Sequence, residues 1–113
     1  MKSKTKNDKP VCEVYASGDK EWYLNGKFHR EDGPAIEYAA GYKSWHLNDK
    51  RHREDGPAIE RAAGYKYWYL NGNLHREDGP AAEYASGYKS WWLNGKPYTP
   101  SAHEITIYKM KQK

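Results

Sequence analysis

A histidine, an arginine and two carboxylates stand together at three places in this chain. The heptapeptide His-Arg-Glu-Asp-Gly-Pro-Ala occurs unchanged at 29–35, 52–58 and 75–81, so it recurs every 23 residues. An imidazole close to a carboxylate could perform acid/base chemistry or bind a metal ion. An enzyme needs one such constellation, whereas three copies indicate a task that is repeated along the chain. A fixed period of this length is typical of repeat proteins.

The heptapeptides are expected to act as structural joints that hold no metal ion. Equivalent points on successive hairpins of a sheet lie roughly 9–10 Å apart, so His29 and His52 are too distant to share one ion. We expect the aspartates to accept backbone N–H groups in turns, and Arg30, Arg53 and Arg76 to pair with carboxylates of the next repeat. The other predicted structural residues of the heptapeptides are Asp32, Asp55, Asp78, Gly33, Gly56 and Gly79.

β-Hairpins are the elements that the sequence supplies to position these joints. Each repeat opens with a short strand-like piece, such as Ile36–Ala39, turns at a glycine and continues through Lys-x-Trp-x-Leu to an Asn-Gly or Asn-Asp pair. Asn, Asp and Gly tolerate the positive φ of tight turns. We therefore predict an all-β repeat protein in which four 23-residue hairpin units form one elongated, twisted antiparallel sheet of about eight or nine strands. The four units are 12–34, 35–57, 58–80 and 81–103.

The two ends of the chain differ from the repeats. Residues 1–10 are polar, rich in lysine and closed by Pro10, which predicts a disordered basic leader. The repeat array then occupies residues 11–103. In residues 104–113 the β-branched alternation of Glu104–Tyr108 predicts a closing strand, and the lysines after it form a basic tail that discourages edge pairing.

The two faces of the predicted sheet have different sequence patterns. One face carries lysine, tryptophan and leucine in every repeat, as packing requires, and its predicted structural residues are Trp22, Trp45, Trp68 and Trp91. The other face varies and is aromatic, and aromatic residues dominate protein-protein hot spots. We predict a contiguous patch of Tyr67, Tyr69, His46 and Trp92 there. The full set of predicted partner-binding residues is Tyr42, His46, Tyr65, Tyr67, Tyr69, Tyr88 and Trp92. Alternatively, these residues are cross-strand pairs that stiffen the sheet.

Charge and cysteine content narrow the function classes. The net charge of +4 lies in the tails, which leaves the body between residues 10 and 104 at −1, without the basic footprint that phosphate binding leaves. Nucleic-acid binding by the basic tails and by the strip of lysines and tryptophans on the invariant face stays open as an alternative.

Cys12 is the sole cysteine, which excludes an intramolecular disulfide and suits a reducing compartment. Because no apolar run is long enough to span a bilayer, we expect a cytoplasmic protein without a membrane partner.

Residues 12–103 resemble a known family. Tyr or Trp, then Asn-Gly-Lys, His, Gly and Tyr-Ala-x-Gly on a 23-residue period are similar to MORN-type repeats, and more closely to the MORN-variant repeats of bacterial and phage proteins, some of them antitoxin components. Here Arg-Glu-Asp-Gly replaces the shorter glycine-rich connection of MORN repeats. The resemblance implies a non-enzymatic module without a cofactor that binds another protein, as an inhibitor or neutraliser of a bacterial defence or toxin component. A sponge for an anionic nucleotide signal is the alternative.

Overall fold

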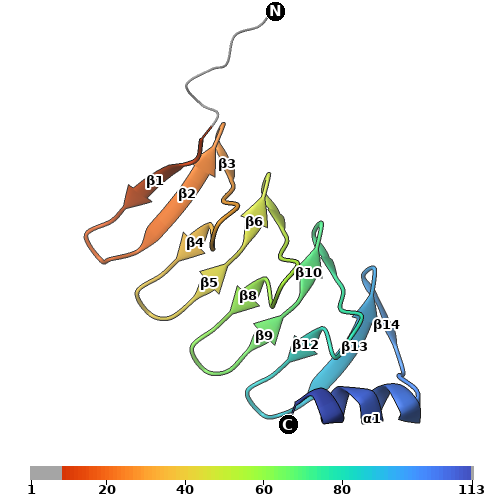
Figure 1. Ribbon diagram of the computed structural model, residues 1–113. Helices are drawn as coiled ribbons and strands as arrows, with labels where there is room; N and C mark the ends of the chain where they lie inside the picture. Colours follow the sequence, from red (N-terminus) through yellow and green to blue (C-terminus); the bar gives the residue numbers. More distant parts are fainter. Residues whose placement is uncertain (1–8, 113) are drawn as a thin grey trace, which may run out of the picture.

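The computed structural model describes residues 9–112, and this part of the chain is mostly antiparallel β-strands with one short helix (Figure 1). The predicted all-β class is confirmed at this level. The predicted leader falls mainly on residues 1–8, which lie outside the described residues. The elements are β1 (Val11–Val14), β2 (Lys20–Leu24), β3 (Lys27–Phe28), β4 (Ile36–Glu37), β5 (Lys43–Ser44), β6 (His46–Leu47), β7 (Lys50–Arg51), β8 (Ile59–Glu60), β9 (Lys66–Tyr67), β10 (Tyr69–Leu70), β11 (Asn73–Leu74), β12 (Ala82–Glu83), β13 (Lys89–Leu93), β14 (Lys96–Tyr98) and α1 (Ala102–Lys111).

The strands follow one another across the molecule in chain order. Within residues 9–112 the main sheet has ten strands in the order β1-β2-β4-β5-β8-β9-β12-β13-β14, with β3 beside β2, while β6–β7 and β10–β11 form two separate pairs. Figure 1 shows the hairpins descending like steps from the N-terminal to the C-terminal end, where α1 lies across the last step. Trp45 separates β5 from β6. The Trp45 N–H donates to the Ala58 carbonyl, and the Trp45 carbonyl accepts from the His52 N–H. The segment from β5 to β6 therefore changes its pairing partner at Trp45.

A row of alternating charges crosses the main sheet. Glu37 is paired with Lys20 on one side and with Lys43 on the other, and the same register continues as far as Lys89 on β13. Opposite charges directly across from each other stabilise a sheet. The invariant lysines therefore have an electrostatic reason as well as a packing reason. The complete row is Lys20, Glu37, Lys43, Glu60, Lys66, Glu83 and Lys89.

The residues next to this row point to the opposite face, because side chains alternate along a strand. They are Glu21, Ile36, Ser44, Ile59, Tyr67, Ala82 and Ser90. Ile36, Ile59 and Ala82 are buried, as are the alanines that end the three heptapeptides. The four predicted structural tryptophans stay partly exposed. Among the described residues, the buried hydrophobic side chains are thus alanines and two isoleucines, together with Tyr108 from the C-terminal end.

The C-terminal segment is a helix, so the prediction of a closing strand at Glu104–Tyr108 was wrong. α1 begins with a capping box, in which Ser101 Oγ accepts from the Glu104 N–H and the Glu104 carboxylate accepts from the Ser101 N–H. Lys109 and Lys111 lie in its last turn, where positive charge favours a helix. Across residues 9–112, no helix combines the length and apolar character that crossing a membrane would need.

Candidate functional site

The arginine of each heptapeptide fastens the loop to a tryptophan and to the following strand. The Arg53 guanidinium carbon lies 3.8 Å from the centre of the Trp45 ring. Its Nη1 donates to the Pro57 carbonyl at 3.0 Å and to Glu60 at 3.1 Å. Arg76 repeats this arrangement, and so does Arg30, whose contact with Glu37 is an ion pair at 3.6 Å. The predicted pairing of these arginines with carboxylates of the next repeat is confirmed, and cation–π contact with the tryptophan adds to it.

The aspartates and glycines of the heptapeptides serve the same arginines. Asp32, Asp55 and Asp78 each accept the arginine Nε–H of their own heptapeptide at 3.0 Å, instead of the backbone N–H groups that we predicted. The guanidinium lies where it does because a glycine leaves room for it. A Cβ placed on Gly33, Gly56 or Gly79 would lie 2.8, 2.9 or 2.7 Å from the guanidinium carbon, so a side chain there would displace the arginine.

The histidines secure the turns that follow. Nδ1 of each histidine accepts a backbone N–H from an asparagine 19 residues further on, and Nε2 faces the glutamate of the same heptapeptide. Accepting at Nδ1 places the proton on Nε2, which donates to the carboxylate. The asparagines have a φ of 50° and need this support; they are Asn48, Asn71 and Asn94. In residues 9–112, groups of three or more His, Cys, Asp or Glu side chains placed to hold a metal ion are absent.

His46, a predicted partner-binding residue, is enclosed by the fold. It is 7% exposed, and its Nε2 lies 2.7 Å from Ser44 Oγ. Its Nδ1 is the one buried side-chain N or O atom without a hydrogen-bond partner among the described residues. Burial lowers the pKa of His46 from its ordinary value. The ring packs beside Phe28, which leaves His46 little surface to offer, so its predicted contact with a partner stays a prediction that would need the ring to become exposed.

Four tyrosines pack together in a group that we call the tyrosine cluster, in which one ring is exposed and three are half-buried: Tyr88 is exposed, and Tyr65, Tyr67 and Tyr84 are half-buried. The Tyr84 ring lies 6.3, 5.8 and 5.5 Å from those of Tyr65, Tyr67 and Tyr88. Three of the four were predicted as partner contacts; Tyr84 was missed, although it belongs to the same variable set. Tyr88 is 65% exposed.

The other predicted contacts lie outside the tyrosine cluster. Tyr69 contacts Arg51, Tyr42 stacks on Tyr38, and Trp92 donates its indole N–H to Ser90 at 2.8 Å. Each of these residues contacts a different neighbour, so the contacts do not join Tyr67, Tyr69, His46 and Trp92 into the predicted contiguous patch. Tyr42, Tyr69 and Trp92 individually stay predicted partner contacts.

Tyrosines near the N-terminal end are tied to one carboxylate. Glu21 accepts hydrogen bonds from the hydroxyl groups of Tyr15, Tyr23 and Tyr38 at 2.9, 2.6 and 2.9 Å. These hydrogen bonds lower the pKa of Glu21, and the bond from Tyr23 has the largest effect. The same bond raises the pKa of Tyr23 to about 12. The sequence signal for this cluster of hydrogen bonds was Glu21 itself, because the other repeats carry serine or tyrosine at the equivalent position. These tyrosines therefore have a structural role.

Two grooves separate successive heptapeptides on the tryptophan face. The first groove, of about 640 Å³, has Trp45 and Leu47 between the heptapeptides at 29–35 and 52–58. The second groove, of about 590 Å³, has Trp68 and Leu70 between those at 52–58 and 75–81. Two arginines and four carboxylates line each groove. Negative charge therefore exceeds positive charge there, and an anionic ligand is disfavoured.

Comparison of the chain with models of protein families, with curated proteins and with solved structures finds no match. The function is therefore inferred from the geometry of these surfaces and from the sequence.

Proposed function

We propose that the chain is a non-enzymatic protein-binding module built from four stacked 23-residue hairpin units. Hydrogen bonds that recur at this spacing support the repeat, as do the three identical arginine joints. The polar groups of the heptapeptides are engaged in holding loops, turns and strands together. This supports a structural role for residues that could otherwise carry out acid/base chemistry.

The tyrosine cluster is the surface we assign to the partner. The observation that carries the proposal is Tyr88, which exposes 65% of its surface while its ring stays packed against Tyr84, 5.5 Å away. A large ring that is already held in place loses little conformational entropy on binding. Such rings commonly supply most of the energy of an interface.

The partner we propose is a bacterial defence or toxin component, which the module inhibits or neutralises. This part rests on the resemblance to MORN-variant repeats of bacterial and phage proteins. The two alternative functions are less well supported by the geometry. The grooves carry more negative than positive charge, which opposes an anionic nucleotide. Each lysine in the row of alternating charges has a glutamate directly across from it, which weakens attraction to nucleic acid.

Affinity purification tests protein binding. Tagged wild-type protein and Tyr88→Ala are expressed in the native host, and retained proteins are quantified by mass spectrometry. A protein enriched by the wild type and depleted with Tyr88→Ala is expected. Recovery of nucleic acid or nucleotide in place of a protein would favour an alternative function.

A further inference from the structure

The helix α1 packs against the third heptapeptide and Trp91, at a position that we call the third groove because it corresponds to the other two. Tyr108, 8% exposed, lies with its ring centre 5.6 Å from the Arg76 guanidinium carbon and 5.7 Å from the Trp91 ring, which it meets edge-on at 79°. Its Cδ1 lies 2.9 Å from where a Cβ on Gly79 would be. Gly79 therefore has to be a glycine for the tyrosine ring as well as for the arginine.

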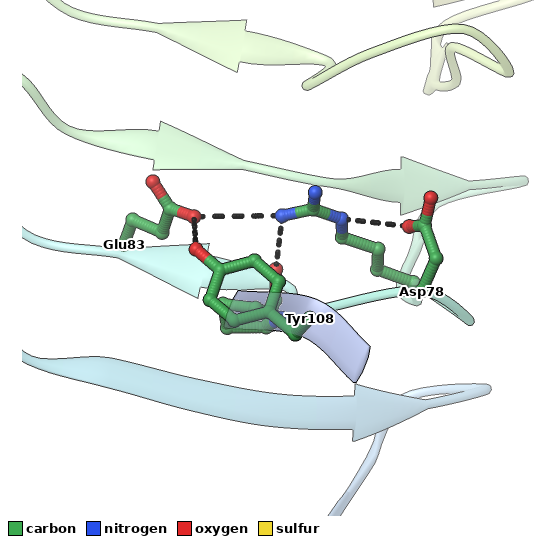
Figure 2. Close-up of polar contacts among 5 residues, drawn as sticks. Asp78, Glu83 and Tyr108 are labelled. Atoms are coloured by element: carbon green, nitrogen blue, oxygen red, sulfur yellow. Dashed lines mark hydrogen bonds and ion pairs between the residues drawn. The ribbon is translucent and has the colours of Figure 1, made fainter. Parts of the chain in front are cut away.

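The hydroxyl group of Tyr108 has its own acceptor. It donates to Glu83 at 3.2 Å, and the same carboxylate oxygen accepts from Arg76 at 3.4 Å. Figure 2 shows Tyr108 reaching Glu83 at one end of the guanidinium, with Asp78 at the other end. The docked helix also shields this joint, since the Asp78 side chain is 62% exposed against 88% and 87% for Asp32 and Asp55.

Three residues that contact Tyr108 have equivalents that line the two grooves. Counting back 23 residues from Arg76, Gly79 and Trp91 gives Arg53, Gly56 and Trp68, all of which line the second groove. Counting back once more gives Arg30, Gly33 and Trp45, all of which line the first groove. Glu83 corresponds to Glu60 and Glu37, whose side chains are 35% and 32% exposed beside their arginines.

We propose that the first and second grooves each bind a tyrosine side chain presented by a protein partner. The ring lies between Trp45 and Arg30 in the first groove, or between Trp68 and Arg53 in the second. Its hydroxyl donates to the glutamate that pairs with that arginine at the side of the groove, which is Glu37 or Glu60. Phenylalanine fills the space without the hydrogen bond. A phosphotyrosine is rejected because four carboxylates line each groove. This inference rests on the proposed function in taking the partner to be a protein, but it concerns a different surface from the tyrosine cluster.

The test uses p-cresol, the tyrosine side chain as a free molecule, and the full-length wild-type protein labelled with ¹⁵N. The indole N–H signals of Trp45 and Trp68 should shift saturably as p-cresol is added, while that of Trp91 should stay in place because Tyr108 occupies its groove. The matched control is 4-methylanisole, which keeps the ring but lacks the donor. A hydrogen bond to a carboxylate is worth roughly tenfold or more in affinity, so 4-methylanisole should bind about tenfold more weakly.

The Tyr108→Ala variant supplies an internal reference. Removing the ring opens the third groove, so p-cresol should then shift the signal of Trp91 as well. If Trp45 and Trp68 of the wild type stay unshifted at concentrations that shift Trp91 in the variant, the proposal is overturned. Equal affinity for p-cresol and 4-methylanisole would also overturn it. Should the variant fail to fold, the wild-type titration with its two probes decides alone.

Failure of this proposal is distinguishable from failure of the proposed function. Tyr88→Ala leaves both grooves intact, so it should leave the p-cresol titration unchanged whatever it does to partner capture. Loss of partner capture in Tyr88→Ala would stand even if p-cresol did not bind.

Discussion

The imidazole Nδ1 of His52 accepts a hydrogen bond, at 2.9 Å, from the backbone N–H of Asn71. Asn71 lies in the left-handed region with a φ of 50°, at a turn 19 residues further along the chain. His29 and His75 make the same bond to their own asparagines. Each histidine thus connects its heptapeptide to the turn of the following hairpin, which explains why its identity does not vary.

His52→Ala should lower the free energy of unfolding by about 0.5–1.5 kcal/mol, because it removes the acceptor of the exposed Asn71 N–H. His52→Asn should lose less, since an amide oxygen can take the place of Nδ1. Denaturant titration followed by circular dichroism measures both. The control is His103→Ala, at an exposed position in α1, which should change stability by less than about 0.5 kcal/mol. Equal losses for His52→Ala and His103→Ala would show that the bond contributes nothing.

Arg53→Lys should destabilise the fold by about 1–2 kcal/mol, even though it preserves the charge. A lysine ammonium cannot stack on Trp45 while reaching Asp55, Pro57 and Glu60 together, as the guanidinium does. Arg61→Lys is the matched control, because Arg61 is exposed and lies over a tyrosine at 5.1 Å. Thermal unfolding compares the two, and a similar shift for both would argue against the joint.

Stability should fall on acidification because of His46. Burial lowers its pKa below the ordinary value of 6.5, so the folded protein holds this imidazole neutral while the unfolded chain takes up a proton. The unfolded state then binds more protons, so the contribution of His46 is complete above about pH 6.5 and is lost as the pH falls below it. Wild type should therefore lose more stability than His46→Gln between about pH 7 and pH 5. Parallel pH profiles for the two proteins would contradict this.

Ser101→Ala should weaken the start of α1 by about 1 kcal/mol, because the Glu104 N–H loses its cap. The loss should appear as lower protection of the α1 amides in hydrogen exchange. Thr99→Ala, at an exposed position before the helix, is the control. Unchanged protection in Ser101→Ala would show that docking of Tyr108 alone holds the helix.

The antiparallel hairpins could be predicted because turn chemistry is local. Gly18, Gly41, Gly64 and Gly87 have φ between 94° and 103°, which is what an invariant turn glycine predicts. The helix was missed because Ile105-Thr106-Ile107 alternates like a strand. The capping box from Ser101 to Glu104, directly after a proline, was the available signal.

The candidate surfaces were less predictable because they depend on contacts distant in the sequence. Variation between repeats led to the tyrosine cluster, but it gave no sign that His46 would be enclosed beside Phe28. The grooves depend on each arginine lying over its tryptophan, which the sequence does not reveal. The third groove is occupied by Tyr108, which comes from a segment outside the repeats. Repetition in the sequence indicated that all three heptapeptides have the same structural role, but the contacts that carry out this role could be found only in the three-dimensional structure.

The measurement that tests protein binding most directly is the dissociation constant of the purified partner, by isothermal titration calorimetry, for wild type, Tyr88→Ala and Val14→Ala. Val14 exposes 65% of its surface, as Tyr88 does, but it lies outside the tyrosine cluster. Tyr88→Ala should weaken binding by about 2 kcal/mol, roughly thirtyfold, with its circular dichroism spectrum unchanged, and Val14→Ala should bind like wild type. An unchanged dissociation constant for Tyr88→Ala would contradict the assignment of the partner to the tyrosine cluster.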